Sequence, residues 1–325
     1  MRRAHSIRPQ TRNAPAPNII EDGWALRCIS GLEILNAKLF DAVPWVVHGF
    51  STRKSGASWL NGAAALNLGF TDWDSRDAVA QNRKALALAI LNRKLGSKAR
   101  ANVLTEESLI TLQQIHSDVV HVISKPSARP PQGDAVLCTR TGLFLGVLSA
   151  DCIPILLADA RRRMVGAVHA GWRGTLARVV AKTLGRMRLE FGTQPEDVVA
   201  ALGPAIGPCC YEVGPEVAQA FAAQFARAAE WFEGPFERSA TGEEPNPLPW
   251  LNMMPPGHEP PPERVRLDLR AANRWQLVDA GVNPRNIAVS ALCTGCRSDL
   301  FFSYRKEGAG TGRMMSMIGI SATSR

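Results

Sequence analysis

The sequence has few of the residues and segments that several protein classes require. It has six histidines in 325 residues, and a blue-copper centre combined with a trinuclear cluster needs more imidazoles than these. The longest strongly apolar stretch, residues 142–150, is too short to cross a bilayer. The sequence therefore predicts neither a multicopper oxidase nor a protein that spans a membrane.

A secretory signal is also missing from the beginning of the sequence. The first residues are basic, but no apolar segment follows them within the first thirty residues, as a signal peptide would require. The seven cysteines are an odd number and do not suggest a disulfide framework. We therefore expect a cytoplasmic protein whose thiols are free or bound to metal.

The composition is that of a globular protein, with 46% hydrophobic and 21% charged residues. The formal net charge is +9 and the sequence pI is near 9.5. Because the basic residues are dispersed and have no aromatic residues interleaved among them, we expect no nucleic-acid partner. An anionic small substrate accounts for the excess charge more readily.

The order of predicted elements indicates one domain. Residues 1–22 form an expected disordered basic tail, and residues 23–325 form a catalytic domain that contains a proline-rich loop at 235–262. Nine prolines in that loop exclude regular structure there. The apolar periodicity predicts helices at 77–95, 176–189, 215–230 and 267–280, a strand covered on both faces at 164–169, and a closing β pair at 301–305 and 314–320.

Three residues have the types that a catalytic zinc site takes. His116, Cys152 and His169 each lie at the end of a predicted strand, where side chains from neighbouring strands converge. Two imidazoles and a thiolate leave a fourth zinc position for water. Their spacing is not that of a zinc finger, so a packed thiol and hydrogen-bonded histidines remain the alternative.

Four other cysteines form a second group of candidate metal or redox residues. Cys293 and Cys296 form a C-x-x-C pair, and Cys209 and Cys210 are adjacent. Adjacent cysteines are poor partners in one ligand set, and no thioredoxin-like pattern surrounds the C-x-x-C pair. We therefore expect these thiols to have a structural role.

Several segments together resemble one known family. They are VVHGFSTR, LNLGF, QNR, QQIHSDVV, SADCIPILLAD, GAVHAGWRGT, GPAIGPCCYEVG and CTGCRSDLFFSYRKEGAGTGRMMSMIGI. In order along residues 46–320, they are similar to the YfiH family, also called the multicopper polyphenol oxidoreductase or laccase-like family. The resemblance implies an α/β (α+β) single domain in which layered β-sheets are flanked by helices.

The resemblance also implies a site and a set of activities. The zinc ligands of the family fall on His116, Cys152 and His169. The implied activities are phosphorolysis of adenosine, inosine and methylthioadenosine, and deamination of adenosine, so the implied partners are purine nucleosides and phosphate. Zn²⁺ is the implied cofactor.

Other residues are expected to serve these reactions. Gly171 begins a turn that opens a helix and offers backbone amides to an oxyanion, and Arg53 and Arg173 add charge-assisted contacts. Zinc deaminases of nucleobases place a glutamate two residues after the histidine ligand. Gly171 occupies that position here, so Asp151 is the candidate acid and base.

Two other functions remain open from the sequence. Cys152 is a possible nucleophile of a cysteine hydrolase, with His169 or His116 as its base. A non-catalytic role, such as a peptidoglycan-editing factor acting through a partner, is the second. The sequence leaves open the preferred nucleoside and the oligomeric state.

Overall fold

The computed structural model describes residues 18–92, 108–126, 129–236 and 264–321. Residues 1–17 of the expected tail and residues 237–262 of the proline-rich loop lie outside this part of the chain. The boundary of the tail needs a correction, because Asn18–Glu21 forms strand β1 and pairs with the next strand. The start of the proline-rich loop also needs a correction, because residues 235 and 236 belong to strand β15 (Phe232–Phe236).

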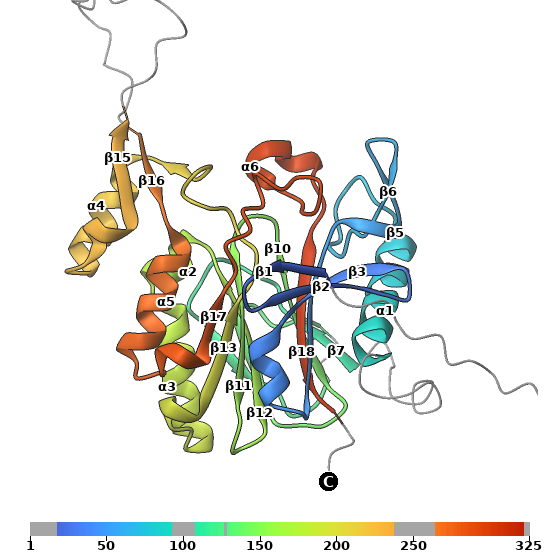
Figure 1. The fold of residues 1–325 in the computed structure, drawn as a ribbon, viewed down its shortest axis with the longest axis horizontal. Coiled ribbons are helices and arrows are strands. Elements are labelled where there is room, and N and C mark those ends of the chain that lie inside the picture. Colours follow the sequence, from blue (N-terminus) through green and yellow to red (C-terminus); the bar gives the residue numbers. More distant parts are fainter. Residues whose placement is uncertain (1–17, 93–107, 127–128, 237–263, 322–325) are drawn as a thin grey trace, which may run out of the picture.

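Two β-sheets form the centre of the molecule (Figure 1). Neighbouring strands are antiparallel except for three parallel pairs, β10–β7, β13–β17 and β8–β9. The first sheet has the order β1, β2 (Trp24–Ile29), β3 (Leu32–Ala37), β4 (Val46–Ser51), β18 (Met314–Ile320), β10 (Phe144–Ser149), β7 (Leu109–Thr111). The second has the order β17 (Ile287–Val289), β13 (Val198–Leu202), β11 (Ile153–Asp159), β12 (Met164–Ala170), β9 (Ala135–Cys138), β8 (Val120–Val122).

The two sheets pack face to face over a shared hydrophobic core. Phe50 and Leu145 from the first sheet belong to the same buried cluster as Leu156 and Val165 from the second. Every residue of β11 and β12 is buried, because one face of these strands meets the first sheet and the other meets helices. This confirms the prediction of a doubly covered strand at 164–169.

Helices cover the outer face of each sheet (Figure 1). Helix α1 (Arg76–Asn92) packs Leu86 and Ile90 against the first sheet. Helices α3 (Val179–Phe191) and α5 (Leu269–Asp279) pack against the second sheet. The structure thus confirms the expected α/β fold of layered sheets flanked by helices.

Smaller elements surround this sandwich. A three-stranded sheet of β14 (Glu212–Val213), β16 (Arg264–Leu267) and β15 lies beside α4 (Pro215–Gln224), and β5 (Lys54–Leu60) pairs with β6 (Ala63–Ala65). Two short helices, α2 (Trp172–Leu176) and α6 (Tyr304–Glu307), lie near the site described below. The described 3₁₀ turns are η1 (Lys38–Ala42), η3 (Pro195–Asp197), η4 (Ala228–Trp231), η6 (Pro284–Asn286) and η7 (Gly308–Gly310).

The predicted closing β pair is only half correct. Residues 314–320 form β18, but Tyr304–Glu307 is helix α6 rather than the end of a strand. The side chain of Ser303 accepts a hydrogen bond from the Lys306 amide and caps this helix. Phe301 and Phe302 are buried in a loop, so their apolar character came from core packing and not from strand alternation.

Two helix predictions also differ from the structure. The helix expected at 176–189 is divided into α2 and α3, because Arg178 has a left-handed backbone with φ 61°. The helix expected at 215–230 ends at Gln224, because the next residue, Phe225, is extended. In both cases tertiary packing overrides a helical apolar pattern.

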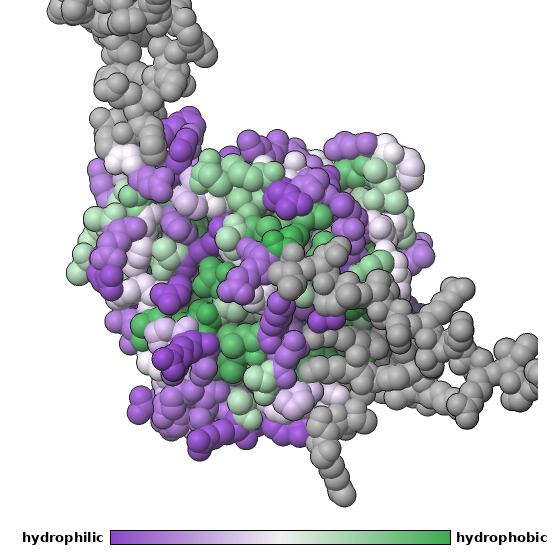
Figure 2. Space-filling model, in the orientation of Figure 1, coloured by the Kyte–Doolittle hydropathy of each residue, from purple (hydrophilic) through white to green (hydrophobic). Residues whose placement is uncertain are grey.

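Figure 2 shows where polar and apolar side chains reach the surface on one face of the molecule. In Figure 2, hydrophilic side chains predominate around the lower end of α3, whereas hydrophobic ones reach the surface near the middle of this face. Within the described ranges, no helix combines the length and the apolar composition that a bilayer crossing demands.

Candidate metal centre and cavity

The three predicted metal ligands lie where the chain passes between the two sheets. His116 lies between β7 of the first sheet and β8 of the second, and Cys152 lies between β10 and β11. His169 is in β12, directly opposite Pro154 of β11. The two connections between the sheets therefore place the Cys152 thiol and the His116 imidazole beside His169, which lies in the buried strand β12.

The geometry of these side chains suits a metal ion. Their ligand atoms all lie within 4.8 Å of one another. The Cys152 Sγ is 3.8 Å from the His116 Nε2, and the two imidazole centroids are 5.0 Å apart. Zinc bonds of about 2.3 Å to sulfur and about 2.0 Å to nitrogen place tetrahedral ligand atoms about 3.5 Å apart, so small side-chain movements complete the site.

A buried carboxylate holds two of the three ligands. Asp134 Oδ1 accepts hydrogen bonds from His169 Nδ1 at 2.9 Å and from the His116 amide at 3.1 Å. Its Oδ2 accepts hydrogen bonds from the amide and hydroxyl of Ser117. Because Nδ1 of His169 is engaged, its Nε2 remains for the metal, and a carboxylate behind a histidine ligand fixes the orientation of the ring.

The charges in the site favour a thiolate. Burial opposes ionisation of Cys152, but His169 and His116 outweigh it and lower the pKa of the thiol to about 6. Burial likewise opposes protonation of His169, but the Cys152 thiolate and Asp134 raise its pKa to about 9. Since the thiolate is the form that binds metal, the lowered pKa of Cys152 suits this side chain to bind a cation.

The backbone beside the candidate ligands has uncommon dihedral angles and a close contact. His116 has φ 58° and Asp151 has φ 99°, which are uncommon values for residues with a side chain. A Cβ at Gly171 would lie 2.9 Å from the Cys152 Sγ and 3.0 Å from the His116 Cδ2. Glycine is therefore required at 171 because the backbone of α2 approaches the ligands closely.

The three ligands lie at the wall of a cavity of about 650 Å³. Arg173, Arg305 and Arg313 also line it, whereas Asp151 is its one acidic residue among the described residues. The arginines make the cavity attractive to anions. The remaining lining residues are Gly69, Phe70, Thr71, Leu112, Gln114, Leu148, Ser149, Ala150, Trp172, Tyr211, Tyr304.

Asp151 is fixed by two other parts of the chain. The Thr294 hydroxyl donates to its Oδ1 and the Arg305 amide donates to its Oδ2, both at 2.7 Å. The carboxylate therefore faces the cavity from a defined position. A carboxylate has about four acceptor sites, so two hydrogen bonds leave others for a ligand.

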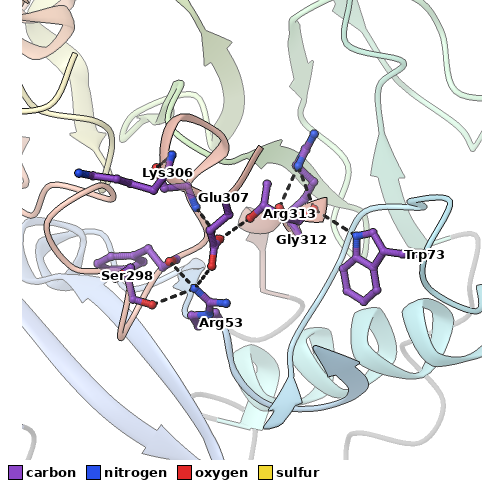
Figure 3. A network of polar contacts seen from close by, with 10 residues as sticks. Arg53, Trp73, Ser298, Lys306, Glu307, Gly312 and Arg313 are labelled. Carbon is purple, nitrogen blue, oxygen red and sulfur yellow. Dashed lines mark hydrogen bonds and ion pairs between the residues drawn. The ribbon is translucent and has the colours of Figure 1, made fainter. Parts of the chain in front are cut away.

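Arg53 is placed differently from the other predicted substrate residues. It is not among the residues that line the cavity. Its Nη1 contacts Glu307 at 2.7 Å and donates to the Ser298 carbonyl (Figure 3). Its guanidinium also lies over the Phe302 ring. Arg53 thus holds the loop that carries Tyr304 and Arg305 into the cavity.

Several residues of the site were missed by the sequence analysis. Asp134, Tyr211, Arg305 and Arg313 were not singled out, although an acidic residue immediately before the apolar strand at 135–138 was a visible signal for Asp134. Arg305 and Arg313 had no such signal, because loops far apart in the sequence bring them to the cavity.

Replacing Asp134 tests the role of the carboxylate. Asp134→Asn loses the charge that orients His169, and we expect metal affinity at the site to fall about 10–100-fold, measured by competition with a chelating dye. Asp159→Asn is the matched control, because Asp159 is equally buried but binds the amides of Arg161 and Arg162 at the other end of β11. Equal losses in both variants would contradict a specific role for Asp134.

Relatives with assigned names resemble this chain over most of its length. A purine nucleoside phosphorylase of Deinococcus radiodurans is 36% identical over 290 residues, covering 89% of this chain and 94% of that protein. Adenosine deaminase RL5, from an unknown prokaryotic organism, is 32% identical and covers 84% and 93%. The human purine nucleoside phosphorylase LACC1 is 31% identical over 84% of this chain, which spans 55% of that protein's length.

A solved structure and a family model agree with these relatives. The crystal structure of the hypothetical protein YfiH from Bacillus licheniformis matches with a TM-score of 0.71 and 27% identity, covering 94% of this chain and 99% of that one. The model of the multi-copper polyphenol oxidoreductase laccase family matches residues 47–321. This chain therefore belongs to that family, the YfiH family.

Proposed function

We propose that this protein is a zinc-dependent enzyme of purine nucleosides. It phosphorolyses adenosine, inosine and methylthioadenosine, deaminates adenosine, and uses His116, Cys152 and His169 as metal ligands. The observation that carries the proposal is the convergence of these three ligands on the wall of a cationic cavity. The names of the relatives described above, two purine nucleoside phosphorylases and an adenosine deaminase, supply the substrate class.

The donor set fits zinc and one substrate position. Two neutral imidazoles and one thiolate supply three ligands, which is the number found in catalytic zinc sites. When bound, zinc supplies Lewis acidity that activates water or polarises an oxygen of the substrate. Asp134 keeps the His169 imidazole turned toward the ion through its bond to Nδ1.

The donor set also bears on the copper in the family's name. Two imidazoles and a thiolate occur in blue-copper sites as well. Among the described residues, however, the other two histidines lie elsewhere: His48 accepts from the Ala37 amide within the first sheet, and His121 bonds the Gln132 carbonyl. The described part of the chain therefore lacks the additional imidazoles that a trinuclear copper cluster needs, which supports zinc over oxidase chemistry.

Arg173 is the proposed phosphate ligand. Its guanidinium stacks on Trp172 and donates no hydrogen bond within the described part of the chain. Arg305 and Arg313, by contrast, donate to backbone carbonyls of Glu212 and Gly312. The five N–H groups of Arg173 are thus available for bidentate contact with a phosphate oxygen pair.

Aromatic side chains are the proposed contacts of the purine. Phe70 and Tyr304 line the cavity and are 50% and 53% exposed, respectively. Arg76 and Arg83 lie over the Phe70 ring and Arg313 lies over the Tyr304 ring. A planar base would therefore contact the part of each ring that the guanidinium groups leave exposed. Tyr211 and Trp172 extend this surface toward the metal ligands.

Asp151 is the proposed acid and base for deamination. It lines the same cavity as the ligands, and its two hydrogen bonds fix the direction of its carboxylate. From this position it is suited to take a proton from the attacking water and to return it to the leaving ammonia. Gly171 contributes by leaving room for the ligands, and Arg53 by holding the loop that bears Tyr304.

One observation favours a second candidate, a cysteine hydrolase. The lowered pKa of Cys152 and its contact with His116 are also features of a nucleophile paired with a base. Metal removal separates the two functions. A chelator abolishes turnover by the zinc enzyme, whereas a cysteine nucleophile keeps its activity without metal and loses it on alkylation.

Loss of a ligand tests the proposal directly. In Cys152→Ala and His169→Ala we expect the zinc content to fall by about one equivalent per chain, because three ligands are required. Phosphorolysis and deamination should both fall to background, measured by chromatography of adenosine incubated with and without phosphate. Cys28→Ala is the control, since Cys28 is an exposed thiol outside the site. Full turnover in either ligand variant would refute the assignment.

A change at Arg173 distinguishes the two reactions. Removing a charge-assisted hydrogen bond costs about 1.5–3 kcal/mol, so Arg173→Gln should raise the KM for phosphate about 10–100-fold. Deamination needs no phosphate and should keep its rate. Arg186→Gln, on the exposed face of α3, is the matched control. An unchanged phosphate KM in Arg173→Gln would show that another group binds phosphate.

A further inference from the structure

Four cysteines outside the proposed active site converge on one point. The Sγ atoms of Cys209, Cys210, Cys293 and Cys296, here called the cysteine cluster, all lie within 4.8 Å of one another. From the sequence, the adjacent Cys209 and Cys210 are poor partners in one ligand set, but the structure brings both thiols beside the C-x-x-C pair. We propose that the cysteine cluster is a second metal site, which binds Zn²⁺ through four thiolates and has a structural role.

The distances fit a tetrahedral thiolate site. Cys296 Sγ lies 3.4 Å from the Sγ of Cys209 and 3.5 Å from that of Cys210. With a zinc–sulfur bond of about 2.3 Å, the edges of a tetrahedron are about 3.8 Å, close to these values. A disulfide would need one pair at about 2.05 Å, but Cys296 is almost equally distant from two thiols, so no single pair is singled out.

The backbone explains how adjacent cysteines reach one ion. The amides of Cys210 and Tyr211 both donate to the Gly207 carbonyl, at 2.9 and 3.0 Å, so the chain turns tightly at this point. The opposite loop is joined to this turn by the parallel bridge between Ala205 and Cys293. Consecutive side chains on the tight turn can therefore face the C-x-x-C loop together.

Backbone groups and glycines complete the pocket of the cluster. The Gly207 amide donates to the Cys293 Sγ at 3.2 Å, a contact that stabilises a thiolate. A Cβ at Gly295 would lie 3.0 Å from the Cys210 Cβ and 3.1 Å from its Sγ. A Cβ at Gly207 would lie 3.3 Å from the Cys209 Sγ. Glycine at both positions leaves the space in which the thiols meet.

Positive side chains balance the charge of such a site. Four thiolates and one Zn²⁺ carry a net charge of about −2. A Cβ built on Gly295 would lie 3.7 Å from the Lys306 Cε. A Cβ built on Gly207 would lie 3.2 Å from an Nη of Arg270. Arg270 also donates to the carbonyls of Ala205 and Leu292, which flank the two loops. These cations reduce the cost of a dianionic centre.

The position of the cluster indicates what the metal does. Thr294, between the two cysteines of the C-x-x-C pair, donates to Asp151 at 2.7 Å. Tyr211 follows Cys210 directly and lines the cavity. A metal ion at the cysteine cluster therefore joins the two loops that support Asp151 and Tyr211, and its stabilisation is gained only when both loops are in place.

Metal analysis of the full-length protein as isolated under reducing conditions tests this proposal. The wild-type chain should hold about two equivalents of zinc, and Cys152→Ala should keep about one, in the cysteine cluster. Cys296→Ser should lose this equivalent and keep the other. Cys28→Ser, at an exposed thiol outside both sites, should keep both. Cobalt-loaded Cys152→Ala should show the intense sulfur-to-cobalt charge-transfer absorption of a four-thiolate centre.

Three results would overturn the proposal. One is a wild-type chain with a single equivalent that Cys152→Ala loses entirely. Another is immediate reaction of all the cluster thiols with a disulfide reagent in the native, metal-loaded protein. The third is a mass lower by two hydrogens for protein isolated without reductant, together with a peptide map that places the disulfide within the cysteine cluster. The wild-type and Cys152→Ala measurements decide the matter even if Cys296→Ser does not fold. Nucleoside turnover is read separately, so its failure leaves this result unaffected.

Discussion

The hydrogen bonds of the Asp134 carboxylate are the contacts on which the candidate metal centre depends. One oxygen binds the imidazole of His169 and the amide of His116, and the other binds Ser117. Burial would raise the pKa of this carboxyl, but the hydrogen bonds from His169 and Ser117 lower it to about 2. A single ionised group therefore joins β12 to the loop of His116 and aims two ligands at Cys152.

Asp151 connects this centre to the rest of the cavity wall. Its carbonyl accepts from the Ile206 amide, and its carboxylate accepts from Thr294 and Arg305. Three loops that are distant in sequence therefore meet at the residue beside Cys152. The cysteine cluster lies on two of these loops. The protein thus supports its proposed reactive groups from both sides, with Asp134 behind the histidines and the cysteine cluster behind Asp151.

The sequence predicted the features that are local or carried by a specific motif. The two-faced burial of residues 164–169 followed from their continuous apolar run, and the motif around Cys152 and His169 identified the family. Features that depend on tertiary contacts were not predicted. Apolar residues at 301–302 suggested a strand but are anchors of a loop, and a helical pattern at 176–189 is broken by the backbone of Arg178. The cysteine cluster depends on a turn at Gly207, which spacing alone does not reveal.

The most direct test of the account is a crystal structure of the protein as isolated, with anomalous diffraction measured on both sides of the zinc absorption edge. The account predicts a zinc peak at about 2.3 Å from the Cys152 Sγ and about 2.0 Å from one nitrogen of each of His116 and His169, with one further position open toward the cavity. An anomalous peak of equal height on both sides of the zinc edge, or the absence of any anomalous peak among these three side chains, would contradict it.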